Sequence, residues 1–171
     1  MKITTNTDFT TLVIQEVYAP CGLIVSNHLL DRESREYQAS SFELNNLKVK
    51  ARKAKITPKK IGQFVTLWKR NKNGDTAPYE ESDKVDLFVI DVLEASHMGQ
   101  FIFPKEVLME KGIVSCNKNE GKRGFRVYPP WSQPTNKTAE NTQKWQLEYF
   151  LKIGQNSRTD LDKARMLYLL R

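Results

Sequence analysis

Apolar residues recur with helical spacing near both ends of the chain. Between residues 7 and 18 they fall on one face of a helix, which Pro20 brings to an end. The segment Lys137–Ile153 has apolar residues at positions i, i+4 and i+8 and predicts a second helix, and Asp160–Leu170 predicts a third. The pattern therefore predicts one N-terminal helix and two C-terminal helices.

Between these helices, apolar and polar residues follow patterns that predict short β-strands. The candidate strands are residues 23–30, 37–44, 47–56, 64–69, 85–93, 99–103 and 121–128. The run 85–93 is apolar at both parities, which is typical of a central strand covered on both faces. A short helix is expected from Pro104 through Glu110.

Two of these strands are expected to form a β-hairpin. Asn45 and Asn46 separate them, and asparagine tolerates the positive φ that a two-residue turn requires. Such a turn pairs Leu44 with Leu47 and brings the apolar residues of both strands onto one face. The opposite face then carries a row of three cations, namely Lys48, Lys50 and Arg52. The alternation breaks after Arg52, which predicts a bulge or a strand end at that point.

Together, these elements predict a single α+β domain over residues 1–171. We expect a mixed central sheet of about five or six strands that includes the hairpin, flanked by the N-terminal helix and the two C-terminal helices. Apolar residues make up 39% of the chain and charged residues 27%, which favours a folded domain over a disordered one. We expect a cytoplasmic location, because the N-terminal residues lack a signal-peptide core and the two cysteines have no CxxC partner.

One segment accounts for the whole positive excess of the chain. Ten of the 27 basic residues fall between Lys48 and Lys72, with no acidic residue among them. The other 17 basic and 20 acidic residues leave a formal charge of −3 outside the segment, although the whole chain carries +7. Concentrated positive charge creates a local field that attracts polyanions.

Aromatic and glycine residues beside the cations favour nucleic acid as the polyanion. Trp68 is followed directly by Lys69 and Arg70, and this combination of a stacking surface with phosphate-binding charge is typical of single-strand binding. In the strand around Arg126, glycines lie beside cations and allow close approach of a phosphate. The alternative is that the lysines only keep a sheet face soluble while Trp68 belongs to the core.

We therefore predict a non-catalytic protein that binds DNA or RNA with little sequence specificity. The predicted nucleic-acid-binding residues are Lys48, Lys50, Arg52, Lys53, Lys55, Lys59, Lys60, Trp68, Lys69, Arg70 and Arg126. Reversal of Lys48, Lys50 and Arg52 to glutamate is expected to abolish binding and to leave the fold intact.

Two other functions remain open. A magnesium-dependent nuclease would use acids around the central strands, such as Asp86 or Asp91, with Glu43 as a further candidate. A protein-interaction or small-anion module would also use the basic surface. We predict no cofactor and no metal site, because the chain has no GxxxxGK[ST] or GxGxxG motif, and His28 and His97 have no zinc-site spacing.

Long blocks of the chain resemble the MepB family. These blocks are RKAKITPKKIGQFVTLWKR, GQFIFPKEVLMEKGIVS, and EGKRGFRVYPPW followed by KWQLEYFL, within about residues 35–153. The resemblance implies a small bacterial cytoplasmic protein, encoded in some species beside a multidrug efflux pump and its repressor. It links the chain to drug response and implies no particular chemistry.

The strand order also resembles the restriction-endonuclease-like core. That family places an acid on the first hairpin strand, where Glu43 lies here, and an acid followed by x-Lys on the second. The second strand of this chain offers Lys48-Val49-Lys50 or Arg52-Lys53-Ala54 for that motif, so a cation stands where the second acid is required. A cation repels a metal ion, so the departure argues against cleavage by that mechanism and is compatible with a binding scaffold.

Overall fold

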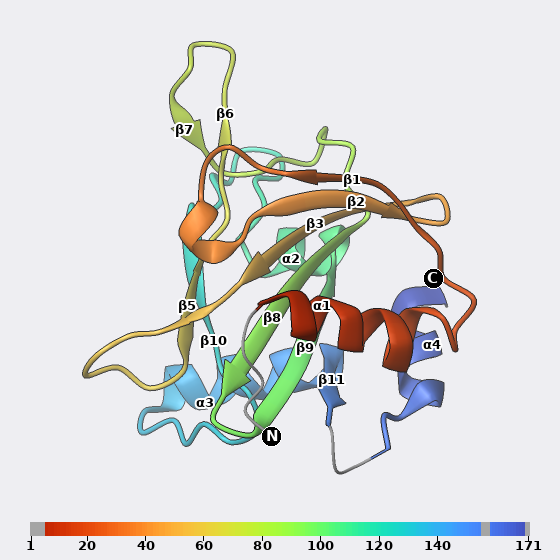
Figure 1. Ribbon diagram of the computed structural model, residues 1–171. Coiled ribbons are helices and arrows are strands. Elements are labelled where there is room, and N and C mark those ends of the chain that lie inside the picture. The colour runs from red at the N-terminus through yellow and green to blue at the C-terminus, as the bar shows by residue number, and fades with distance from the viewer. Residues whose placement is uncertain (1–5, 155–157, 170–171) are drawn as a thin grey trace.

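A mixed six-stranded sheet forms the centre of the protein (Figure 1). The computed structural model describes residues 6–154 and 158–169, without the side chains of residues 6–8. The strands lie in the order β1 (Val25–Leu30), β2 (Ser40–Leu44), β3 (Leu47–Lys53), β8 (Leu87–Glu94), β9 (His97–Pro104) and β11 (Phe150–Ile153). Only the β3–β8 pair is parallel among them. The expected α+β class and mixed central sheet are confirmed.

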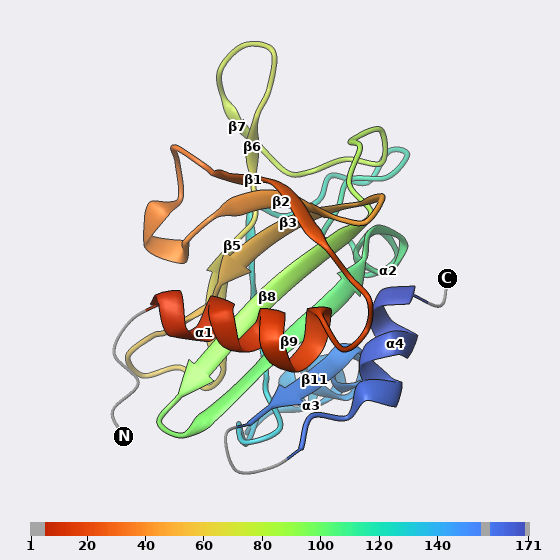
Figure 2. The same cartoon turned by 45° about the vertical axis from the view of Figure 1, so that its right-hand side comes forward.

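Helices cover one face of this sheet and a smaller layer covers the other. On one face lie α1 (Asn6–Val13), its continuation η1 (Ile14–Tyr18) and α4 (Leu161–Leu169) (Figure 2). The other face is covered by the β10 (Gly124–Val127), β5 (Gln63–Thr66) and β4 (Lys55–Ile56) sheet, by α2 (Lys105–Glu110) and by α3 (Lys137–Gln146). The pair β6 (Lys69–Arg70) and β7 (Thr76–Ala77) forms an arm that projects beyond the sheet (Figure 1). Short 3₁₀ turns are η2 (Arg35–Tyr37) and η3 (Leu147–Tyr149).

The β2–β3 hairpin has the predicted register. Leu44 pairs with Leu47 across the turn, and Asn45 has a φ of 54°, as the two-residue turn requires. β3 ends at Lys53, and the next two residues in strand conformation, β4, belong to the smaller sheet. The predicted strand end near Arg52 is therefore confirmed. The chain leaves the main sheet there, and Ala54 packs among the buried residues beneath the smaller sheet.

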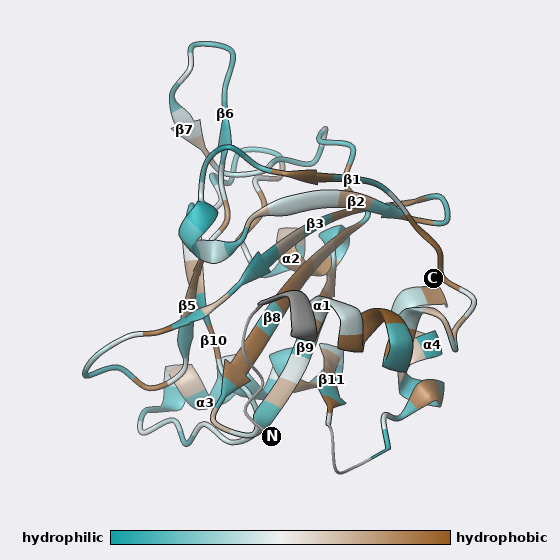
Figure 3. Ribbon diagram, in the orientation of Figure 1, coloured by the Kyte–Doolittle hydropathy of each residue, from teal (hydrophilic) through white to brown (hydrophobic). Residues whose placement is uncertain are grey.

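β8 is buried along most of its length and separates two core clusters. Leu87 and Val89 face the cluster beneath α1 and α4, and Phe88 and Ile90 face the cluster beneath the smaller layer. All four side chains are at most 1% exposed. Figure 3 shows the strand as hydrophobic along most of its length, in contrast to the hydrophilic β6–β7 arm. The prediction of a central strand covered on both faces is confirmed.

The predicted helix Lys137–Ile153 is wrong after Gln146. α3 ends at Gln146, a single 3₁₀ turn follows, and Phe150–Ile153 forms β11 at the edge of the main sheet. The apolar spacing suited a helix, but the free edge of β9 offers backbone hydrogen bonds to an extended segment. Tertiary pairing therefore outweighed the local pattern. The last helix is observed as α4, and its predicted end at Leu170 lies outside the described residues.

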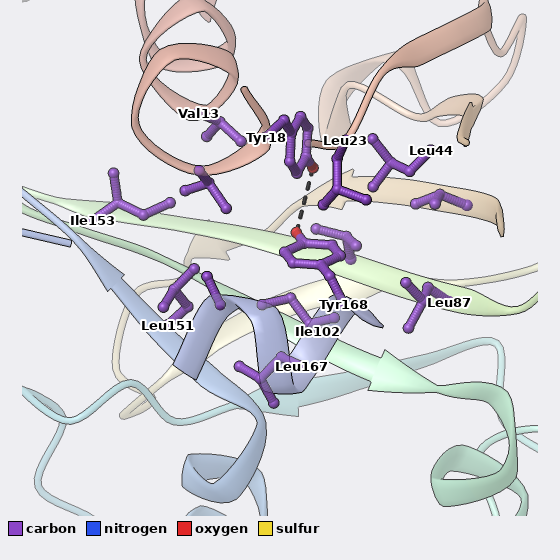
Figure 4. Close-up of a cluster of buried hydrophobic side chains, with 14 of the residues drawn as sticks. Val13, Tyr18, Leu23, Leu44, Leu87, Ile102, Leu151, Ile153, Leu167 and Tyr168 are labelled. Atoms are coloured by element: carbon purple, nitrogen blue, oxygen red, sulfur yellow. Dashed lines mark hydrogen bonds between the residues drawn. The ribbon is translucent and has the colours of Figure 1, made fainter. Parts of the chain in front are cut away.

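A chain of buried polar groups crosses the cluster beneath α1 and α4. The hydroxyls of Tyr18 and Tyr168 lie 3.3 Å apart (Figure 4), and Tyr168 donates to Gln100 Oε1 at 2.9 Å. Gln100 Nε2 in turn donates to Asp91 Oδ1 at 2.8 Å. Burial raises the pKa of Asp91 to about 7, against the opposing effects of the Gln100 hydrogen bond and of Lys53. The ionised carboxylate is therefore less favourable here than in an unfolded chain.

No helix in the described part of the chain is long and apolar enough to cross a membrane.

Replacement of Asp91 by asparagine is expected to stabilise the protein above neutral pH. The pKa of Asp91 is raised from its ordinary value of 3.8. Because the unfolded chain loses this proton first, wild-type stability falls as the pH rises from about 4 to about 7. Asp91→Asn lacks this loss, so its free energy of unfolding should exceed that of the wild type by up to about 4 kcal/mol at pH 8 and by less than half of that amount at pH 5.

Urea unfolding of both proteins between pH 5 and pH 8 measures this difference. The control is Asp162→Asn, because the Asp162 side chain is 99% exposed and its replacement should give a nearly constant difference. A loss of stability in Asp91→Asn at pH 8 would show that the ionised carboxylate is stabilising and that the expectation is wrong.

Candidate nucleic-acid interface

A polar groove runs along the face of β3 that points away from α1. It consists of a hollow of about 520 Å³ and a second of about 250 Å³, which share Lys50. We call it the β3 groove. Its lining residues are Asn27, Leu29, Asp31, Arg32, Glu33, Ser34, Ser41, Phe42, Glu43, Lys48, Val49, Lys50, Arg52, Trp68, Lys69, Arg70, Tyr79, Lys84 and Val85. The groove thus brings together five of the predicted cations, from β3 and β6, with Trp68.

Three lysines in the groove have no ion pair within the described structure. Lys48 and Lys84 are exposed, and Lys50 Nζ donates to the Ser41 hydroxyl at 2.7 Å. Lys48 and Lys50 lie two residues apart on one face of β3, as predicted from the alternation. Lys84 joins them from the loop before β8, so the three ammonium groups belong to one end of the groove.

The expectation that Arg52 looks outward beside these lysines is wrong. Its side chain is 2% exposed, and its Nη1 lies 3.3 Å from Asp31 Oδ2 and donates to the Ala51 carbonyl. Nη2 lies 3.4 Å from the Tyr79 hydroxyl, and Nε has no partner. The Asp31 carboxylate and the Tyr79 hydroxyl lie against the Arg52 guanidinium and help to bury it. A glutamate here would leave Asp31 beside a second buried carboxylate, so the triple reversal would damage the fold.

The two cations of β6 are bound to the protein's own carboxylates. Lys69 Nζ lies 2.7 Å from Asp83 and 3.2 Å from Glu80. Arg70 binds Glu33 through Nε at 3.0 and 3.1 Å and through Nη2 at 2.6 Å. Its hydrogen bonds lower the pKa of the Glu33 carboxyl.

Trp68 forms part of the groove wall. The Arg70 guanidinium lies 5.1 Å from the centre of its ring, so the stacking surface is already in contact with a cation. The indole is half-buried and borders the groove, and it does not belong to either core cluster. The alternative of Trp68 as a core residue is therefore not observed.

The remaining predicted cations lie outside the β3 groove. Lys53 points to the opposite face of the sheet, and Lys55 pairs with Glu36 at 2.7 Å and lies over Tyr37. Lys59 and Lys60 are exposed in the loop after β4. Arg126 is engaged within the fold: it donates to Thr57 Oγ1 at 2.5 Å and lies over Phe64. The basic segment therefore does not form one continuous cationic face, because the chain changes sheets after Lys53.

The three acids of the nuclease alternative are in different places. Glu43 lies in the groove and accepts a hydrogen bond from Asn27 at 3.2 Å. Asp86 accepts one from the Lys48 backbone N–H at 2.7 Å, before β8 begins. Asp91 faces the cluster beneath α1, on the other side of the sheet from Glu43. No group of three or more metal-ligating side chains occurs among the residues that the structure describes.

Sequence reasoning missed the groove's second wall. Arg32, Glu33 and Asp31 come from the link between β1 and β2, and Lys84 comes from the loop before β8. The signal available in the sequence was the mixed charge of the link DRESR at residues 31–35. It could not reveal which basic residue each acid would meet, because the partners are 21 and 37 residues away in the chain.

Comparison with known proteins identifies relatives of this chain. Residues 31–152 match the MepB-like family. A crystal structure of MepB is similar with a TM-score of 0.76 and 34% identity, over 91% of this chain and 99% of that chain. A bacterial homing endonuclease shows a TM-score of 0.43 and 17% identity, over 84% and 93%, a similarity too distant to support an argument. No curated protein matches this chain.

The family match covers most of the folded chain, and the crystal structure of MepB extends the similarity to nearly its whole length. Both agree with the resemblance seen in the sequence blocks around the basic segment. This chain belongs to the MepB-like family.

Proposed function

We propose that the β3 groove binds the phosphate backbone of single-stranded nucleic acid without cutting it. The observation that supports this most is the convergence of Lys48, Lys50 and Lys84 with Lys69 and Arg70 on one groove that also contains Trp68. Cations along a groove with an aromatic side chain in its wall are the elements of single-strand binding.

The charge balance of the groove favours an anionic ligand. Its lining contains seven basic residues and three acidic ones, which is a formal excess of +4. Asp31 and Glu33 form ion pairs with Arg52 and Arg70. In contrast, Lys48, Lys50 and Lys84 form no ion pair with the described residues. These three lysines are therefore the first contacts that a phosphate would make.

The Arg70–Glu33 pair does not prevent binding. Both side chains are nearly half exposed, at 47% and 46%, and exposed pairs of this kind contribute only about 0–1 kcal/mol. A phosphate offers Arg70 the same bidentate geometry as the carboxylate and can replace it. Release of Glu33 would also free the Arg70 guanidinium to bind phosphate beside the Trp68 ring.

Low sequence specificity follows from the kinds of side chain in the groove. Reading a base edge requires amide or guanidinium groups placed against it. Asn27 is the one amide side chain in the lining, and two of the three guanidinium groups, those of Arg52 and Arg70, are engaged by carboxylates. Stacking on Trp68 accepts any base. Lys53, Lys55, Lys59, Lys60 and Arg126 lie outside the groove and contribute only to the long-range field that attracts the ligand.

We also infer a cytoplasmic location for the protein. Cys21 and Cys116 are both free thiols, which is what a reducing compartment maintains. Detection of the protein in the soluble cytoplasmic fraction of its host cell tests this.

Wild-type protein is expected to bind a 20-nucleotide single strand with strong salt dependence. Contacts from about four cations predict that log K falls with log salt with a slope of about −3. Lys48→Glu with Lys50→Glu should weaken binding at least about thirtyfold at 25 mM salt and reduce the slope by about 1.4. Fluorescence anisotropy with labelled DNA and RNA strands measures both quantities.

The matched control is Lys137→Glu with Lys144→Glu. These exposed lysines lie on α3, and their reversal changes the net charge by the same amount without touching the groove. An equal loss in the control, or no wild-type binding at low salt, would overturn the proposal. Shortened strands after incubation with magnesium would instead favour the nuclease alternative.

Glu33→Gln is expected to tighten binding about two- to tenfold. The substitution removes one negative charge from the groove and weakens the hold on Arg70, which keeps its contact with Trp68. The same anisotropy titration measures the effect, and Glu110→Gln on α2 is the control for loss of a distant charge. Weaker binding by Glu33→Gln would mean that Glu33 orients Arg70 and does not compete with phosphate.

A further inference from the structure

A cavity lies beneath α1, on the opposite side of the main sheet from the β3 groove. Its volume is about 320 Å³, and we call it the α1 cavity. Figure 2 shows α1 crossing this face of β8 and β9. Its lining is Thr10, Val13, Ile14, Tyr18, Val25, His28, Ser40, Phe42, Ala51, Val89, Asp91 and Gln100. The volume falls at the lower end of the roughly 300–1,000 Å³ typical of small-molecule sites.

Asp91 is the one acidic side chain in this largely apolar lining. Its Oδ1 accepts a hydrogen bond from Gln100, and neither carboxylate oxygen forms an ion pair with the described residues. A charged carboxylate in apolar surroundings is costly without a partner, because it has lost its contact with water. The carboxylate lines the cavity, and Lys53 acts on it from the paired strand.

We propose that the α1 cavity binds a small organic cation with an apolar body, and that Asp91 is its counter-ion. An ammonium group would lie against the carboxylate while the apolar part contacts Val13, Val25 and Val89. The cation is attracted by the Asp91 carboxylate, and the apolar body adds burial of its own. A neutral ligand of the same shape has no such advantage.

Aromatic rings in the walls suit the same ligand. Tyr18 and Phe42 have ring centres 6.4 Å apart, and His28 stacks on Phe42 at 6.0 Å. Phenol and phenyl faces attract organic cations. Tyr18 is also fixed in place, because its hydroxyl interacts with Tyr168.

The backbone beside the cavity has a feature that is frequent at functional sites. After Val13, α1 continues as a π-helix over Ile14–Tyr18, and both end residues of this turn line the cavity. π-helical turns are rare and occur mostly at binding or catalytic sites. The wider turn thus lies at the same cavity as the Asp91 carboxylate.

An outer cleft of about 660 Å³ adjoins the cavity and gives access to it. The two share Asp91 and His28, and the exposed Leu30 lines the cleft. The outer cleft is also lined by four basic residues that the inner cavity lacks, so their charges act on Asp91 from outside the proposed site. They are Arg32, Arg35, Arg52 and Lys53. Asp91 lies at the junction of the cleft and the cavity.

Benzylamine, which is protonated at pH 8, and benzyl alcohol, which is neutral and of similar size, test the proposal. We expect benzylamine to bind with a Kd on the order of 1 mM and at least about tenfold more tightly than the alcohol. Two-dimensional ¹H–¹⁵N NMR titration of the full chain measures both affinities. The shifted amides should cluster around His28, Asp91 and Gln100.

Asp91→Asn should reduce the preference for benzylamine to about twofold or less, because it removes the charge and keeps the shape. Asp162→Asn on the exposed face of α4 is the matched control and should keep the preference. Equal binding of the two compounds by the wild type, no binding of benzylamine at 20 mM, or shifts elsewhere in the protein would each overturn the proposal. An unchanged preference in Asp91→Asn would do the same.

Discussion

The parallel pairing of β3 with β8 determines where the polar groups of this protein lie. β8 is buried on both faces, so the strand beside it is also partly enclosed on both. Lys50 lies opposite Phe88, Arg52 opposite Ile90, and Lys53 opposite Asp91. A strand that alternates apolar and basic residues at this position must either direct its cations into an open groove or give them carboxylate partners. The protein does both along a single strand.

Neighbouring residues at the end of β3 serve opposite sides of the sheet. Arg52 points toward the groove face and is neutralised by Asp31, whereas Lys53 points toward the α1 face and acts on Asp91. The groove and the cavity therefore lie on opposite faces of the same sheet, and no charged residue lines both. The groove has an excess of cations, and the α1 cavity has one carboxylate in largely apolar surroundings. Ligands of opposite charge suit the two sides.

The protein's own acids reduce the field that its basic segment would otherwise create. The cations of the β6–β7 arm form ion pairs with Glu33, Glu80 and Asp83, and Lys55 forms one with Glu36. The Lys55–Glu36 and Arg70–Glu33 pairs are exposed and individually weak, so they cost an incoming phosphate little. The Lys69–Asp83 pair is less exposed, at 22% for each side chain. The Arg52–Asp31 pair is different, because its arginine is buried and its loss would leave a charge without a partner. Formal charge along the sequence therefore overestimates the number of cations that a ligand can reach.

Much of the fold and part of the groove could be predicted from the sequence, because they depend on local rules. The Asn45–Asn46 turn and the alternation around it determined the hairpin register, and the double-sided apolar run determined the central strand. Tertiary structure alone decided that Phe150–Ile153 pairs with β9 and that Arg52 is buried. Edge pairing and ion pairs join residues distant in the chain, and no local pattern of side chains encodes which partners will meet.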